Sequence, residues 1–204
     1  MGKTLFVTVL LLIGAVVAAS ACTMGFRVWT SESARRLSIR ETPQIVQATV
    51  VTLTDGQPIV LDKWLATQRR VTIVSFIYTR CNTLCSVLGN EFQQLQAQII
   101  QRHLQDRVQL LSISFDPKGD TSDRLRQYAS SMGANPAIWQ FARVESPDEL
   151  QQLLRAFGIV VIPDRQGGYV HNAALHLVNP QARLVDIEDL DAVAQTLANA
   201  EVVR

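Results

Sequence analysis

The stretch VTIVSFIYTRCNTLCS, residues 71–86, determines which fold the sequence predicts. Its first half, residues 71–78, is a continuous apolar run rich in β-branched and aromatic residues, which is typical of a strand buried on both faces. Cys81 and Cys85 follow directly. The carboxyl end of a buried strand is where open α/β sheets usually bind ligands. The pair can therefore be a redox couple, a metal clamp or a structural staple.

The rest of the chain surrounds this strand with alternating strands and helices. The expected strands are two short ones around the Asp55-Gly56 turn within 45–61, one at 108–115, and a hairpin at 173–187 that turns at Asn179-Pro180. The expected helices are 86–104, 121–132, 146–158 and 189–200. This order predicts an α/β fold with a central sheet flanked by helices on both faces and an N-terminal hairpin, consistent with a thioredoxin-like architecture.

The first residues predict delivery across a membrane. An uncharged run extends from Thr4 to Phe26, long enough for a membrane-spanning helix. Two other signals fit the same residues: a cleaved secretory signal ending near Ala21, or a lipoprotein whose first residue is Cys22. We therefore assign residues 1–29 to a membrane anchor or signal segment, with the uncleaved anchor favoured. Residues 30–44 are polar and weakly patterned and are interpreted as a tether, and 45–204 as one globular domain.

The charge balance argues against one class of partner. Residues 41–204 carry 14 basic and 17 acidic side chains, a net charge of −3. A nucleic-acid-binding surface would be clearly basic. We expect no nucleic acid among the partners, and expect membrane attachment through residues 4–26.

The cysteine spacing leaves several chemistries open. If residues 81–85 are helical, the two Cβ atoms lie roughly 5–6 Å apart, which suits either a disulfide or one metal ion between two sulfurs. In an oxidising compartment the two thiols would tend to pair with each other. Two thiolates cannot complete a tetrahedral zinc site, whereas two thiolates with one imidazole suit copper.

Three histidines are candidates for the third ligand. His103 comes late on the helix expected at 86–104, too far along it to reach the cysteines, and is interpreted as a solvated residue. His176 lies among apolar residues of a strand and is interpreted as a buried histidine with satisfied hydrogen bonds. His171 lies in a Gly-rich loop, and loops at strand ends often carry functional sites. The residues alone do not decide whether His171 is a ligand.

Four segments together resemble the SCO/SenC family of copper-handling proteins of cytochrome c oxidase assembly. They are FIYTRCNTLC at 76–85, SISFDPKGDTSDRLRQYA at 112–129, IWQFARVESPDELQQLLRAFGI at 138–159 and YVHNAALHLVNPQARLV at 169–185. The resemblance covers roughly residues 45–200 and implies a thioredoxin fold with an N-terminal membrane anchor. It implies copper ligands at Cys81, Cys85 and His171, with Asp116 near the site to orient a ligand or attract the cation.

The sequence departs from the family pattern in the cysteine loop. Asn82 and Ser86 stand where the family usually has proline, and Ala182 stands in the late hairpin turn where glycine is common. These differences leave the ligand positions unchanged but put the identity of the recipient protein in doubt.

We therefore expect a copper metallochaperone that delivers copper to a cytochrome c oxidase copper-centre subunit or another copper-receiving protein. The expected location is the bacterial inner membrane, with the globular domain in the periplasm. The alternative is a membrane-anchored thiol-disulfide reductase that uses Cys81 and Cys85 on a partner's cysteines. A structural disulfide without chemistry is the third interpretation, and so short a loop gives little entropic stabilisation.

Overall fold

The computed structural model describes residues 2–23, 25, 28–80, 84–164 and 167–203, and for residues 84–88 it describes the backbone alone. The chain forms two compact units, Met1–Thr42 and Pro43–Arg204. Each unit is described by itself.

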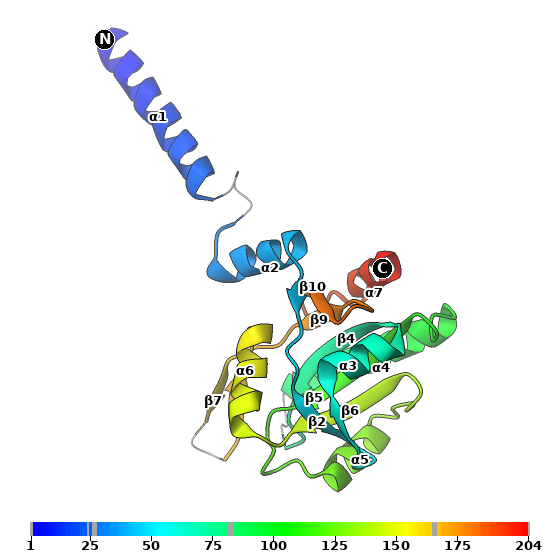
Figure 1. Cartoon of the computed structure of the whole chain (residues 1–204). Coiled ribbons are helices and arrows are strands. Elements are labelled where there is room, and N and C mark those ends of the chain that lie inside the picture. Colours follow the sequence, from blue (N-terminus) through cyan, green and yellow to red (C-terminus); the bar gives the residue numbers. More distant parts are fainter. Residues whose placement is uncertain (1, 24, 26–27, 81–83, 165–166, 204) are drawn as a thin grey trace. The chain divides into compact units, whose positions relative to one another are not determined.

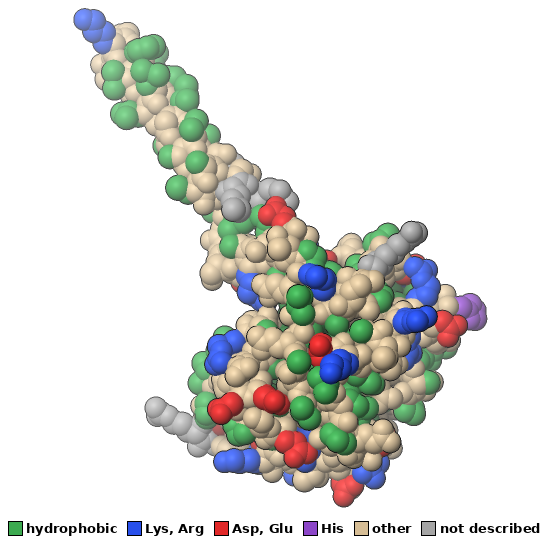
Figure 2. All heavy atoms as spheres, viewed as in Figure 1, with side chains coloured by type: hydrophobic (Ala, Val, Ile, Leu, Met, Phe, Trp, Pro, Cys, Tyr) green, Lys and Arg blue, Asp and Glu red, His purple; other side chains and the backbone are tan. Residues whose placement is uncertain are grey.

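The first unit contains two helices. Helix α1 (Gly2–Cys22) is apolar, and hydrophobic side chains cover the face seen in Figure 2. Its length and composition are sufficient to cross a membrane. Helix α2 (Ser31–Glu41) occupies most of the segment interpreted from the sequence as a weakly patterned tether. Thr30 caps α2 by accepting a hydrogen bond from the Ser33 amide, and Glu32 pairs with arginines one turn later, which explains why this polar segment is helical.

The second unit contains the mixed α/β fold that the sequence predicts (Figure 1). Its strands are β1 (Gln44–Ile45), β2 (Val50–Leu53), β3 (Pro58–Val60), β4 (Val71–Ile77), β5 (Val108–Ser114), β6 (Trp139–Val144), β7 (Val161–Pro163), β8 (Tyr169–His171), β9 (Leu175–Val178) and β10 (Arg183–Glu188). Its helices are α3 (Leu61–Gln68), α4 (Leu84–Gln101), α5 (Ser122–Ser131), α6 (Pro147–Phe157) and α7 (Val193–Val202).

Eight of these strands form one sheet in the order β1-β10-β9-β4-β5-β6-β2-β3. Strands β4, β5 and β6 are parallel and central, and β9 pairs antiparallel with β4 on the other side. All residues of β4 and β5 are buried, because both faces of the sheet are covered. Strands β7 and β8 form a separate two-stranded sheet.

The two faces of β4 pack against different helices because side chains alternate along a strand. Ile73 and Ile77 belong to a core that includes apolar residues of α4, α5 and α7. On the opposite face Phe76 meets Phe157 of α6, with ring centroids 5.1 Å apart. Helices therefore flank both faces, as expected from the sequence.

The structure contains strands that the sequence analysis omitted. Strand β6 lies between α5 and α6, where the half-buried Gln140 and Arg143 interrupt the apolar pattern of WQFARV. The β7–β8 hairpin was also missed, and it carries His171, which the sequence analysis had placed in a loop. His103 follows the end of α4 instead of lying on it, with a backbone φ of 56°.

Candidate metal centre

The candidate site lies at the carboxyl ends of β4 and β5. The two strands are parallel and in register from Val71 opposite Val108 to Ile77 opposite Ser114, so both end at the same edge of the sheet. Tyr78, Thr79 and Arg80 lead from β4 toward Cys81, and the segment 115–121 leads from β5 into α5. This is the edge where the sequence analysis expected a ligand to bind.

The structure describes the backbone of one of the two cysteines, Cys85. Cys81 lies outside the described residues, and Cys85 lies in the first turn of α4, with its backbone described and its side chain not. The metal or disulfide geometry expected of the pair therefore lies outside the described part of the chain. The position of Cys85 in the chain is informative, because the amide dipoles at a helix N-terminus favour a thiolate.

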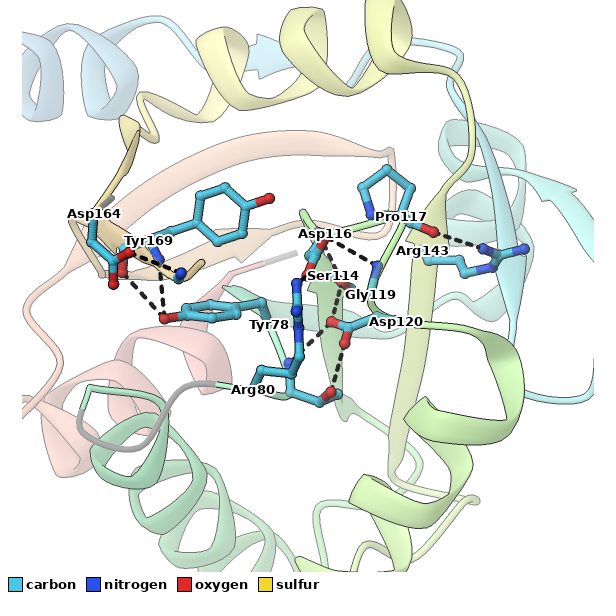
Figure 3. Close-up of polar contacts among 12 residues, drawn as sticks. Tyr78, Arg80, Ser114, Asp116, Pro117, Gly119, Asp120, Arg143, Asp164 and Tyr169 are labelled. Atoms are coloured by element: carbon cyan, nitrogen blue, oxygen red, sulfur yellow. Dashed lines mark hydrogen bonds and ion pairs between the residues drawn. The ribbon is translucent and has the colours of Figure 1, made fainter. Parts of the chain in front are cut away.

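Asp120 holds the segment that leads into the cysteines. Its side chain is fully buried and accepts three hydrogen bonds, two from Thr79 and one from Ser114. The Thr79 amide is 3.0 Å from Oδ2, the Thr79 hydroxyl is 2.5 Å from Oδ1, and the Ser114 hydroxyl is 2.6 Å from Oδ2 (Figure 3). The backbone two residues before Cys81 is thereby fixed to the loop that follows β5.

Asp116 holds the next residue along the same segment. Its buried carboxylate forms an ion pair with Arg80, with Nη2 and Oδ2 2.6 Å apart, and accepts the Gly119 amide at 3.1 Å (Figure 3). Gly119 is required by space, because a Cβ there would lie 2.2 Å from Asp116 Oδ2. The positive charge that the sequence places beside Cys81 is therefore paired with a carboxylate. The prediction that Asp116 orients a ligand or attracts the cation stays a prediction.

His171 is brought to this edge by the β7–β8 hairpin. The residue is 7% exposed, and its ring contacts Phe115 with centroids 4.8 Å apart and Tyr78 with centroids 6.2 Å apart. Nδ1 lies 2.8 Å from the carbonyl oxygen of Asn172 and donates to it, a tautomer that places the lone pair on Nε2. Burial lowers the pKa of His171 below its ordinary value, and the hydrogen bond to Asn172 partly opposes this effect. The lowered pKa favours the neutral imidazole, which is the form that metals bind.

Tyr169 connects the hairpin with the ion pair. Its ring meets the rings of Tyr78 and Phe115 edge-on, at centroid distances of 5.3 and 5.7 Å, and its hydroxyl points toward Asp116 (Figure 3). Burial, and then the negative charge of Asp116, raise the pKa of the Tyr169 phenol, while the positive charge of Arg80 opposes them. The phenol therefore stays protonated and can donate toward the carboxylate.

The other two histidines lie away from this edge. His176 on β9 is fully buried, and its ring nitrogens lie 3.3 Å from the Val74 oxygen and 3.1 Å from the Phe157 oxygen. The interpretation of His176 as a buried histidine is confirmed, and its neutral ring donates to one of these two carbonyl oxygens. His103 is exposed beyond α4, consistent with a solvated side chain, although it is not helical.

Sequence reasoning missed Asp120, Tyr78 and Tyr169. The two aspartates of DPKGDT are four residues apart in a segment already noted for its family resemblance, so Asp120 had a signal that was not used. The two tyrosines had none, because their contact joins residues 91 apart in the chain.

Comparisons with known proteins identify the family. The SCO1/SenC family model matches residues 40–202. A SCO1 protein homologue of Bacillus subtilis is 25% identical over 144 residues, which cover 70% of this chain and 71% of that protein.

Solved structures of similar proteins share the fold. Arabidopsis thaliana ScoI with copper bound superposes with a TM-score of 0.66 at 20% identity, covering 77% of this chain and 98% of that chain. The structure of BsSco, described as a member of the Sco family of cytochrome c oxidase assembly proteins, gives a TM-score of 0.65 at 20% identity, covering 79% and 96%. The family model spans most of the sequence, and the chain belongs to the SCO1/SenC family.

Proposed function

We propose that this protein is a copper metallochaperone that binds copper through Cys81, Cys85 and His171. The observation that carries the proposal is the position of the buried imidazole. Its ring contacts Tyr78, three residues before Cys81, although 93 residues separate His171 from Tyr78 in the chain. Copper in the ScoI structure and the family's association with oxidase assembly support the same reading.

The chemistry of these residues suits copper as cargo. Thiolate sulfur favours Cu(I), and an imidazole nitrogen also supports Cu(II), so this set can hold either state. Asp120 and Asp116 fix the backbone and the arginine just before Cys81. Copper would leave by stepwise ligand exchange, as cysteines of the recipient replace Cys81 and Cys85. We propose a copper-centre subunit of cytochrome c oxidase as that recipient.

The proposed location follows from the apolar helix. Helix α1 is long and apolar enough to cross a membrane, and we propose that it anchors the chain in the bacterial inner membrane with residues 45–204 in the periplasm. Cleavage as a secretory signal and lipidation at Cys22 are the alternatives for the same helix.

The test is a copper titration of the detergent-solubilised, reduced full chain in competition with a chelator of known affinity. Cys81→Ser, Cys85→Ser and His171→Ala should each weaken binding by more than about a hundredfold, since even the loss of residues around metal ligands costs 10- to 100-fold. His103→Ala is the matched control and should bind like the wild type. Absence of copper binding by the wild type, or equal affinity of His171→Ala, would refute the proposal.

One observation favours a second candidate, a thiol-disulfide reductase. Cys85 lies in the first turn of α4, where the helix dipole favours the reactive thiolate. In this role one sulfur attacks the partner's disulfide and the other resolves the mixed disulfide, and His171 is not needed. Trapping a partner as a mixed disulfide with Cys81→Ser or Cys85→Ser, with a yield unchanged by His171→Ala, would favour this function.

A further inference from the structure

We propose that the hydroxyl of Tyr78 is a positioning element of the copper site, because it fastens the strand that carries His171 to the segment that leads into Cys81. The inference rests on the proposed function and assigns to this chain a residue that acts through its ligands.

The hairpin has little structure of its own. It consists of three residue pairs, from Val161 opposite His171 to Pro163 opposite Tyr169. Within the described part of the chain, no strand ladder joins it to the eight-stranded sheet. An isolated two-stranded ribbon is marginally stable in water. The position of His171 therefore depends on contacts between the hairpin and the rest of the domain.

Tyr78 hydrogen-bonds the hairpin to the segment that follows β4, and Asn172 adds a separate hydrogen bond to the Gly158 carbonyl after α6. The Tyr78 hydroxyl donates to the carbonyl oxygen of Tyr169 and accepts from the amide of the same residue, each at 3.2 Å (Figure 3). Both backbone groups of one residue are thus bound by a single side chain, much as a neighbouring strand would bind them. The Tyr78 ring is buried and packs against Phe115 at a centroid distance of 5.3 Å, so the hydroxyl is held in place.

Gly168 leaves the space that this contact needs. A Cβ at residue 168 would lie 3.2 Å from the Tyr78 hydroxyl oxygen and 2.6 Å from Oδ2 of Asp164. Its backbone is outside the left-handed region, so glycine is required here by proximity and not by conformation. The Asp164 carboxylate occupies the same space and accepts the Gly168 amide at 2.8 Å.

The contact joins the two segments that carry the proposed ligands. Tyr78 precedes Cys81 by three residues, and Tyr169 precedes His171 by two. Without the hydroxyl, the hairpin keeps its aromatic contacts and the bond from Asn172 to Gly158, but loses both hydrogen bonds to the segment that leads into Cys81. Copper binding must then order the imidazole, and that ordering reduces the affinity.

The experiment is a double-mutant cycle on the detergent-solubilised full chain, with copper affinity measured by chelator competition. Tyr78→Phe retains the ring and removes the hydroxyl, and it is combined with His171→Ala. Two ordinary hydrogen bonds correspond to a loss of roughly tenfold in affinity. We expect this loss in the presence of His171 and a change of less than about twofold in the His171→Ala background, because the hydroxyl acts through that ring.

The control separates positioning from general destabilisation. Val108→Ala removes buried methyl groups at the opposite end of β5, roughly 20 Å from the site along the strand, and should lower thermal stability without changing copper affinity. The thiolate-to-copper charge-transfer band gives an independent readout, which Tyr78→Phe should shift and Val108→Ala should leave unchanged.

The results test the positioning role of Tyr78 separately from the proposed copper function. An affinity of Tyr78→Phe equal to that of the wild type, or an equal loss in both backgrounds, would overturn the positioning role while leaving the copper function intact. Absence of copper binding by the wild type would overturn the proposed function and this inference with it.

Discussion

Replacing Asp120 by asparagine tests whether the loop after β5 holds the entrance to the cysteine loop. The substitution keeps the size and shape of the side chain. It removes the negative charge and replaces one acceptor oxygen by an NH₂ group, which faces donors from Thr79 and Ser114. If the amide oxygen takes the place of Oδ2, the Thr79 hydroxyl must turn to accept from the NH₂ group, and the hydrogen bonds lose their charged acceptor.

The expected magnitude follows from the contacts. A hydrogen bond to a charged group contributes about 1.5–3 kcal/mol, whereas one between neutral groups contributes about 0.5–1.5 kcal/mol. Because the three bonds share one acceptor group and are not additive, we expect Asp120→Asn to lower the free energy of unfolding by about 2–4 kcal/mol. That is a large fraction of the roughly 5–15 kcal/mol of an ordinary domain.

The assay is urea unfolding of the full chain in detergent, followed by tryptophan fluorescence, to which the buried Trp139 contributes. Asp123→Asn is a matched control three residues away. The Asp123 side chain is 81% exposed and pairs with Arg126 on the helix surface, so its loss should cost less than about 1 kcal/mol. Equal losses for the two variants would refute the assignment of Asp120 as the buried anchor of Thr79.

Three further predictions concern the packing around Gly119, the buried His176 and the membrane anchor. Gly119→Ala should lower the free energy of unfolding by about 1–3 kcal/mol, because the new Cβ would overlap the Asp116 carboxylate. Urea unfolding measures this loss, and a variant as stable as the wild type would contradict the close contact between Gly119 and Asp116. His176→Ala should cost about 2–5 kcal/mol and leave the copper stoichiometry at that of the wild type, so a loss of bound copper from the folded variant would make His176 a ligand. The full chain should remain in the membrane pellet after alkaline extraction. Cys22→Ser should not release it if α1 is the anchor, whereas release together with loss of a lipid mass would identify a lipoprotein.

The elements with strong local signals were predictable from the sequence. Strand β4 is an unbroken apolar run, and α6 begins after Ser146, which caps it, and ends at Gly158 in the left-handed conformation. Strand β6 was not predicted, because the pairing of β6 with β5 and β2 places Gln140 and Arg143 at partly covered positions that look polar in a short window.

The site was predictable to a smaller extent. The sequence indicated the sheet edge, the histidine to consider and the Asp-Pro segment, because each has a local pattern. It did not indicate that Asp116 pairs with Arg80, or that Tyr78 bonds to Tyr169, because these contacts join residues 36 and 91 positions apart. Such pairs depend on which strand ends become neighbours, and only the completed sheet determines that.

The dependence of Thr79 and Arg80 on carboxylates 41 and 36 residues later has a consequence for biogenesis. A chain that leaves a membrane translocon with its N-terminus first presents Cys81 and Cys85 to an oxidising compartment before Asp116, Asp120 and His171 have emerged. During that interval the carboxylates do not yet hold Thr79 and Arg80, so the segment that leads into Cys81 is unrestrained. On the proposed copper function, thiols that oxidise at this stage must be reduced before the first metal ion is bound.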